Sequence, residues 1–218
     1  IGGVLLRLGF FILALLGTSQ ISVAHPVIFK GGIELQGETQ KKDSAFSTTY
    51  TFSPYWAVAA QYYEMREPSM SPLGRTFEAS TVQINHLLKR WWNEGSQGNI
   101  YLGAGAGVFA PQGLPSEFLA RGEVNADWES TTLYVAARYI YLHPDFSEDV
   151  DFKKLRVGFA PYVLEQEGLN SWFILEWRQM NTEKAEVTPL LRFFFRSVLF
   201  ELGSSLDGDF KFNFMIHY

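Results

Sequence analysis

The amino-acid sequence predicts an all-β protein, a single antiparallel transmembrane β-barrel of about twelve strands, with about ten as the alternative count. Three observations predict this fold. The last residues, 210–218, place apolar side chains at every second position and end on the aromatic Tyr218. The same alternation recurs along the chain, and Phe, Tyr and Trp make up 16% of the residues. A membrane strand has one apolar and one polar face, so a mean hydropathy of −0.03 is compatible with it.

Composition narrows the class of protein before any motif is considered. The 218 residues are 47% hydrophobic, which is too apolar for a disordered chain, and no linker divides them, so we expect one domain. The formal net charge of −5 disfavours a nucleic-acid partner, which would require a basic stripe or cluster. The absence of cysteine excludes disulfides, thiolate metal sites and a cysteine nucleophile.

Residues 1–24 have the three parts of a secretory signal peptide. Arg7 precedes the apolar run 8–16, and Ser22-Val23-Ala24 supplies a small-x-small cleavage site. The run is shorter than the roughly 20 residues that a spanning helix needs, which disfavours the alternative of a membrane anchor. The printed sequence begins without Met, so we expect the basic flank to be incomplete. We therefore expect a cleaved signal peptide at 1–24 and an outer-membrane β-barrel at 25–218.

The period-two alternation predicts the strands in order. We expect them at residues 29–36, 46–52, 56–63, 81–85, 100–109, 118–128, 133–139, 154–159, 173–178, 187–196, 198–202 and 210–218.

The connections predict which end of the barrel faces outward. Tight turns are expected at 53–54, 129–130 and 196–197, and longer loops at 37–43, 67–74 and 143–151. Short periplasmic turns and longer outer loops are the pattern of membrane barrels. Two periplasmic connections, 91–98 and 164–170, are longer than this pattern prefers. The tract 103–107 puts three glycines on the inward face of one strand, which predicts strong curvature or a close approach there.

The apolar strand faces are expected to face lipid. If they faced inward, most of the aromatic residues would have to fill a lumen that usually holds water or polar groups in a barrel of this width. With these faces outward, aromatic side chains gather near strand ends, as at membrane interfaces. They are Trp56, Trp91, Trp92, Trp128, Tyr139, Tyr141, Trp177 and Tyr218. The alternative, a secreted soluble β-protein, requires the opposite assignment.

The terminal strand resembles the assembly signal of the bacterial outer-membrane β-barrel superfamily, and the resemblance covers the chain after residue 24. Its signal residues are Phe210, Phe212, Phe214, Ile216 and Tyr218. The resemblance implies a bacterial outer-membrane location, lipid and lipopolysaccharide as neighbours, and assembly by the barrel-assembly machinery. In size the chain is similar to small twelve-stranded porins for acidic oligosaccharides. Residues 187–194 and 203–205 also resemble small barrels associated with heavy-metal efflux.

The alternation predicts a polar and slightly basic lumen. The inward-facing charges are expected to be Lys30, Arg121, Arg138, Lys154, Arg156, Arg178, Arg192, Arg196 and Lys211, against Glu34, Glu123, Asp127, Glu176 and Glu201. Fixed positive charge favours anions, so the sequence predicts a passive porin-like channel for small anionic solutes. The alternative is an interior filled by salt bridges, in a structural, adhesion or efflux-associated barrel without an open pore. Inward aromatic residues would line or occlude the path, and are expected to be Tyr101, Phe109, Tyr134, Tyr162, Trp172 and Phe194.

The histidines and the acidic run 145–151 are the remaining candidates for chemistry. The histidines show neither a His-x-Ser arrangement nor an Asp-His pair, so the sequence predicts a protein that is not an enzyme, with a lipid hydrolase as the alternative. His25 and His217 are expected to be neighbours where the barrel closes. A metal site there with His86 is the alternative to solvated side chains, and no cofactor or metal is predicted. The acidic run is expected to be a solvated outer loop, with a cation site as the alternative.

Overall fold

The computed structural model describes residues 26–66, 75–162 and 168–218. Its strands are β1 (Ile33–Gln40), β2 (Asp43–Ser53), β3 (Trp56–Met65), β4 (Phe77–Asn93), β5 (Ser96–Pro111), β6 (Glu117–Ser130), β7 (Leu133–Pro144), β8 (Val150–Phe159), β9 (Asn170–Met180), β10 (Glu186–Phe195), β11 (Val198–Ser204) and β12 (Phe210–His217). The predicted all-β class and the count of twelve strands are confirmed. These residues contain no helix that is long and apolar enough to cross a membrane.

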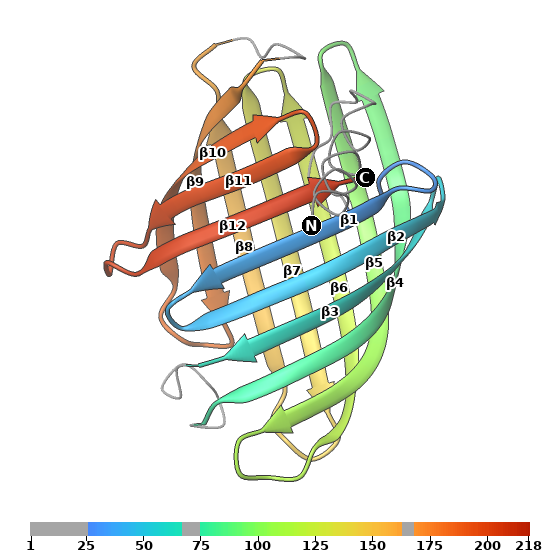
Figure 1. The fold of residues 1–218 in the computed structure, drawn as a ribbon, viewed down its shortest axis with the longest axis vertical. Coiled ribbons are helices and arrows are strands. Elements are labelled where there is room, and N and C mark those ends of the chain that lie inside the picture. The colour runs from blue at the N-terminus through green and yellow to red at the C-terminus, as the bar shows by residue number, and fades with distance from the viewer. Residues whose placement is uncertain (1–25, 67–74, 163–167) are drawn as a thin grey trace, which may run out of the picture.

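The strands close into one antiparallel barrel, which Figure 1 shows in side view. Each strand pairs with its neighbours in sequence, and β1 closes the barrel against β12. The closing register runs from Glu34 opposite His217 to Gln40 opposite Lys211. Closure pairs the backbone groups between strands, as hydrocarbon surroundings require.

Two-residue turns follow β2, β4, β6 and β10 at the end of the barrel where β1 begins, which we call the inner end. The long connection predicted at 91–98 is wrong. β4 continues to Asn93, and Gly95, with φ 72°, allows a tight turn into β5. The register of β4 against β5 shifts between Leu87 and Lys89. An extra residue of this kind moves every later side chain of the strand to the other face of the sheet. The alternation in the sequence therefore breaks at this point, and the predicted strand ends before it.

The opposite end, which we call the outer end, also differs from the prediction at one loop. The long loop predicted at 37–43 is wrong, because β1 continues to Gln40 and only two residues separate it from β2. Gly37 interrupts the alternation for a packing reason: a Cβ atom there would clash with the ring of Phe214 on β12. Between β7 and β8 the loop spans 145–149. The predicted loop 67–74 lies outside the described residues, as do 163–167.

Large apolar side chains cover the outside of the barrel. Val82 and Ile84 on β4 and Phe173 and Leu175 on β9 are all at least half exposed. The inward neighbours Gln83 and Ile174 are buried, so the two faces of each strand are distinct. An apolar exterior on a closed barrel identifies the lipid-facing surface of a transmembrane barrel, as predicted.

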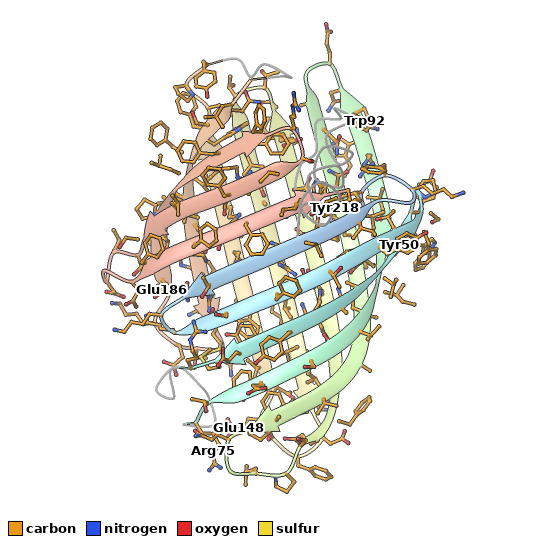
Figure 2. The ribbon with its side chains drawn as sticks, viewed as in Figure 1. Tyr50, Arg75, Trp92, Glu148, Glu186 and Tyr218 are labelled. Carbon is orange, nitrogen blue, oxygen red and sulfur yellow. The ribbon has the colours of Figure 1, made fainter. Side chains whose placement is uncertain are left out.

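Aromatic rings mark the inner end of this surface. Figure 2 shows Tyr50, Trp92 and Tyr218 toward the inner end and Arg75, Glu148 and Glu186 toward the other end. Trp92 follows the register shift of β4 and is exposed on the lumen-side face of that strand, whereas Tyr50 and Tyr218 are exposed on the lipid-facing surface. Amphipathic rings prefer the interface between hydrocarbon and water, so the position of Tyr50 and Tyr218 agrees with the predicted aromatic girdle.

The glycine tract of β5 lies against β4, as predicted. A Cβ atom at Gly105 would lie 2.5 Å from the backbone oxygen of Val82, and one at Gly107 would clash with the backbone of Ser80 and Thr81. Glycine is therefore required for the close approach of these strands, which both curve strongly in Figure 1.

Candidate functional site in the barrel lumen

Charged side chains line the lumen because inward positions alternate with lipid-facing positions on every strand. On β8, Lys154 and Arg156 flank Leu155, which is half exposed on the lipid side. On β9, Glu176 and Arg178 lie two residues apart in the same way. Polar residues at every second position of these strands therefore place several charges in the interior of the barrel.

The largest group of inward-facing side chains joined by ion pairs and hydrogen bonds is called the lumen network here. It comprises Glu38, Asp43, Lys154, Arg156, Glu176, Arg178, Arg192, Glu201, Lys211 and Asn213. Arg156 donates hydrogen bonds to Glu176 (Nε to Oε2, 2.7 Å) and to Glu201 (Nη2 to Oε2, 2.9 Å). Lys211 donates to both Glu38 and Glu176. The network thus joins β8 and β9 to β11, β12 and β1.

Two ion pairs of the network span the lumen. Lys154 Nζ on β8 lies 2.6 Å from Glu38 Oε2 on β1, although β9 to β12 separate these strands around one side of the barrel. Arg178 Nη1 on β9 lies 3.1 Å from Asp43 Oδ1 on β2. These contacts cross the interior directly and narrow it.

A second polar group lies on β4, β6 and β7. Glu123 accepts hydrogen bonds from Arg138 Nε (2.6 Å), Arg121 Nη2 (2.9 Å) and Gln83 Nε2 (3.1 Å). Arg121 Nε also donates to Gln83 Oε1 at 2.7 Å. Nearer the inner end, Asp127 accepts a hydrogen bond from Asn99 Nδ2 at 2.7 Å.

The structure places most of the predicted lumen charges inside the barrel. These are Arg121, Arg138, Lys154, Arg156, Arg178, Arg192 and Lys211 among the cations and Glu34, Glu123, Asp127, Glu176 and Glu201 among the carboxylates. Two placements are wrong. Lys30 is exposed in the turn before β1, and Arg196 is exposed in the β10–β11 turn with φ 55°. Both lie outside the strands, where alternation no longer decides the direction of a side chain.

Glu38 and Asp43 are lumen residues that sequence reasoning missed. Both fall in the segment 37–43, which was predicted as a loop. Once β1 is continued through Gly37, the alternation places Glu38 on the same face as Glu34. With these two carboxylates added and Lys30 and Arg196 outside the lumen, the predicted excess of positive charge disappears. Each cation named above as placed inside the barrel is hydrogen-bonded or paired to a carboxylate.

Two adjoining cavities lie inside the barrel. The inner cavity, of about 90 Å³, extends from Pro26 and Glu34 to Glu38, and the outer cavity, of about 100 Å³, extends from Glu38 toward Phe152. Both are lined by Gln36, Glu38, Ser47, Gln61, Arg138 and Lys154. The Lys154–Glu38 pair therefore lies where the two cavities adjoin.

Apolar side chains pack together inside the outer end of the barrel. We call this group the outer apolar cluster, and it comprises Met65, Phe77, Ala79, Phe109, Leu119, Leu142, Val150 and Met180. The ring centroids of Phe77 and Phe109 are 4.8 Å apart. Phe109 was predicted to face inward, and it is fully buried in this cluster.

The segment 26–32 narrows the inner end. Val27 is fully buried against Ala57, Leu87 and Tyr101, and the backbone nitrogen of Ile28 donates to the hydroxyl of a neighbouring threonine. Among the other predicted inward aromatics, Tyr134 and Trp172 are buried in a further cluster, Phe194 is partly buried, and Tyr162 is exposed beyond the end of β8. The prediction for Tyr162 is therefore wrong, because the strand ends before it.

The histidines do not form a metal site among the described residues. His217 Nε2 lies 2.7 Å from Glu34 Oε2 in the barrel seam, while His86 stacks on Trp56 with a centroid distance of 4.1 Å. His25, the expected neighbour of His217, lies outside the described residues.

The acidic outer loop contains an Asp-His pair that the sequence did not reveal, since the two residues are six positions apart. His143 Nδ1 lies 2.6 Å from Asp149 Oδ1, and the hydroxyl of Tyr141 donates to the other carboxylate oxygen. The hydrogen bond from Tyr141, followed by that from His143, lowers the pKa of Asp149. The pair is largely exposed, and these contacts fix the loop to β7.

The predicted assembly-signal residues lie along the last strand. Phe210, Phe212, Phe214 and Ile216 alternate on β12 with the inward Lys211, Asn213 and Met215, and Tyr218 follows the strand. Phe210 and Tyr218 are exposed. Their face is the lipid-facing one.

A closed twelve-stranded barrel with an apolar exterior and a charged interior defines the class of transmembrane β-barrel proteins. The comparisons agree at the level of the fold. The chain is similar to the solved KdgM porin and to the KdgM porin in complex with disordered oligogalacturonate, each with a TM-score of 0.50 and 10% identity over 86% of this chain and 98% of the other. No family model matches the chain, and no curated protein matches its sequence.

Proposed function

We propose that the protein is a porin-like barrel of the bacterial outer membrane that passes small solutes through a narrow polar lumen. The observation that carries this proposal is the pair of adjoining cavities inside a lipid-facing barrel, of which the inner one is lined largely by polar side chains. A barrel of about this width is wide enough to hold ligands or water beside its own side chains. The fold shared with the KdgM porin supports the class.

The pairing of lumen charges supports a channel with little preference between anions and cations. Fixed charge selects ions only where it is uncompensated along the path. The cations of the lumen network face carboxylates at hydrogen-bond distance, as Arg192 faces Glu201 at 2.7 Å. The KdgM structure with oligogalacturonate supports small anions as one class of solute, and the compensated lining supports neutral solutes as another.

The outer apolar cluster supports a second candidate function, a structural or adhesion barrel without an open pore. Tyr63, Ile140 and Phe152 pack on the outer apolar cluster and extend it into the lumen. Passage of solute then requires these side chains to move. The efflux-associated alternative shares this closed form and has no separate structural support.

We also propose the route by which the barrel reaches its membrane. The signal peptide at 1–24 is removed on export, the barrel-assembly machinery reads the face of β12 that ends at Tyr218, and lipid and lipopolysaccharide surround the apolar exterior. Deleting Tyr218 should lower the amount of folded barrel in the outer-membrane fraction. An unchanged amount contradicts this part of the proposal.

We propose that the protein has no catalytic activity. The exposed Asp149–His143 pair holds a loop, and within the described residues its side-chain hydrogen bonds join it to Tyr141 rather than to a nucleophile. Incubating the purified barrel with phospholipid and lipopolysaccharide tests this. Hydrolysis that is abolished by His143→Ala would overturn it.

Planar-bilayer recording of the purified full-length barrel tests the channel. We expect small conductance steps and a reversal potential close to zero in a tenfold KCl gradient. Flat traces support the structural candidate instead. Large steps with strong anion preference contradict the compensated lumen.

A further inference from the structure

We infer that the inner cavity binds the hydroxyl groups of a small neutral solute, such as a polyol or a sugar. The inference rests on the proposed function and names its substrate class. It depends on three observations: a row of aligned polar residues, two buried atoms without partners, and the balance of charge around the cavity.

The aligned residues are Arg192, Glu201 and Asn213. They lie opposite one another in the register of β10, β11 and β12, so they form one row across three adjacent strands. Glu201 accepts from Arg192 Nε at 2.7 Å and from Asn213 Nδ2 at 2.6 Å. All three line the inner cavity.

Each neighbour of Glu201 in this row has one atom without a partner. Arg192 Nη2 and Asn213 Oδ1 are buried and have no hydrogen-bond partner among the described residues, although the two side chains are only 4% and 5% exposed. The first atom is a donor and the second an acceptor. Hydroxyl groups suit both atoms, because a hydroxyl can accept a hydrogen bond from the first or donate one to the second.

The position of Arg192 is fixed from two sides. Its guanidinium carbon lies 4.6 Å from the centroid of the Tyr134 ring, and its Nε is held by Glu201. Both anchors leave Nη2 without a protein partner. A rigid donor of this kind supports binding because little side-chain freedom is lost when the ligand arrives.

The charge of the lining favours a neutral ligand. Four carboxylates and four cations border the inner cavity: Glu34, Glu38, Glu123 and Glu201, with Arg138, Lys154, Arg156 and Arg192. An anion would have to compete with carboxylates that already hold these cations. A neutral polyhydroxyl molecule leaves the pairs intact and also meets the amides Gln36, Gln61, Gln83, Asn85 and Asn125.

The size of the cavity suits a short polyol. Its volume is about 90 Å³. At about 10–15 Å³ for each water on this measure, this corresponds to roughly six to nine waters. Xylitol, a neutral five-carbon polyol, is therefore a suitable probe, and its carboxylate analogue xylonate is the charged comparison.

Equilibrium dialysis of the full-length barrel in detergent micelles against labelled xylitol and xylonate tests the inference. We expect saturable binding of xylitol, weaker binding of xylonate, and about tenfold weaker xylitol binding by Arg192→Lys, which keeps a cation beside Glu201 but loses Nη2. Arg196→Lys is the matched control, since it makes the same change on the same hairpin in an exposed turn. It should bind xylitol like the wild type.

Three results would overturn the inference: no saturable xylitol binding by the wild type, tighter binding of xylonate, or equal affinity in Arg192→Lys and Arg196→Lys. The wild-type comparison of the two probes needs no variant and decides the matter even if Arg192→Lys does not fold. Swelling of proteoliposomes in xylitol separates this inference from the proposed function. Binding without flux overturns the channel alone, and flux without binding overturns the site alone.

Discussion

Lys154 and Glu38 meet across the interior of the barrel, with Nζ 2.6 Å from Oε2, although the two residues are 116 positions apart in the chain. The pair borders both cavities, so it stands where they adjoin. A contact of this kind sets the width of the lumen and, through its two charges, the local electrostatic balance.

Removing one charge of this pair should tilt the ion preference. Lys154→Ala leaves the carboxylates of Glu38 and Glu176 less compensated, so permeability should shift toward cations. Glu38→Ala should shift it toward anions. Reversal potentials in a KCl gradient measure both, and Lys184→Ala, in the exposed β9–β10 loop, serves as the control. Shifts of the same sign in the two lumen variants would contradict the account.

The outer apolar cluster should contribute both stability and closure. Phe109→Ala removes a fully buried ring and should lower the free energy of unfolding by about 3–5 kcal/mol while raising conductance. Phe118→Ala is the matched change on the lipid side, where no interior cavity forms. It should lower the free energy of unfolding by less than Phe109→Ala does and leave conductance unchanged. Urea unfolding in lipid and bilayer recording give the two readouts. Equal effects of the two substitutions would show that the cluster does not close the lumen.

The glycine tract should tolerate no side chain where β4 and β5 touch. Gly107→Ala places Cβ against the backbone of Ser80 and Thr81. We therefore expect the free energy of unfolding to fall by roughly 1–3 kcal/mol, or the barrel to fail to assemble. Gly122→Ala is the control, because nothing lies within 4 Å of a Cβ there. The two variants are compared by the yield of folded barrel and by the urea concentration at the midpoint of unfolding. Similar values for both variants would refute the close approach.

Most of the fold could be predicted from the sequence because the alternation reports directly on which face meets lipid. The prediction failed where packing or register interrupted that period. Gly37 was taken for the start of a loop, although its missing side chain makes room for Phe214 on a strand that is far away in sequence. The bulge between Leu87 and Lys89 likewise reversed the pattern before the true end of β4.

The site was less predictable than the fold. Alternation identified inward charges such as Arg156 and Glu176, but it carries no information about contacts across the lumen. The predicted lumen was too basic because Glu38 and Asp43 were assigned to a loop, while Lys30 and Arg196, which lie in exposed turns, were counted as inward. The Asp149–His143 pair depends on how one loop folds back on β7, which no local pattern specifies.

The outer loop should stay attached to β7 in mild acid. Because hydrogen bonds from Tyr141 and then His143 lower the pKa of Asp149 below its usual 3.8, the stabilising contact is present above that value and is lost as the pH falls through the lower folded pKa. An NMR titration of the Asp149 carboxyl in micelles measures this. Tyr141→Phe should raise the pKa toward 3.8, and a wild-type pKa at or above 3.8 would refute the contact.

Single-channel recording of the double variant Glu38→Ala/Lys154→Ala tests the central claim most directly. One charge of each sign is removed, so the account predicts larger conductance steps than in the wild type, with the reversal potential unchanged. Steps of wild-type size in the folded double variant would show that this pair does not constrict the lumen.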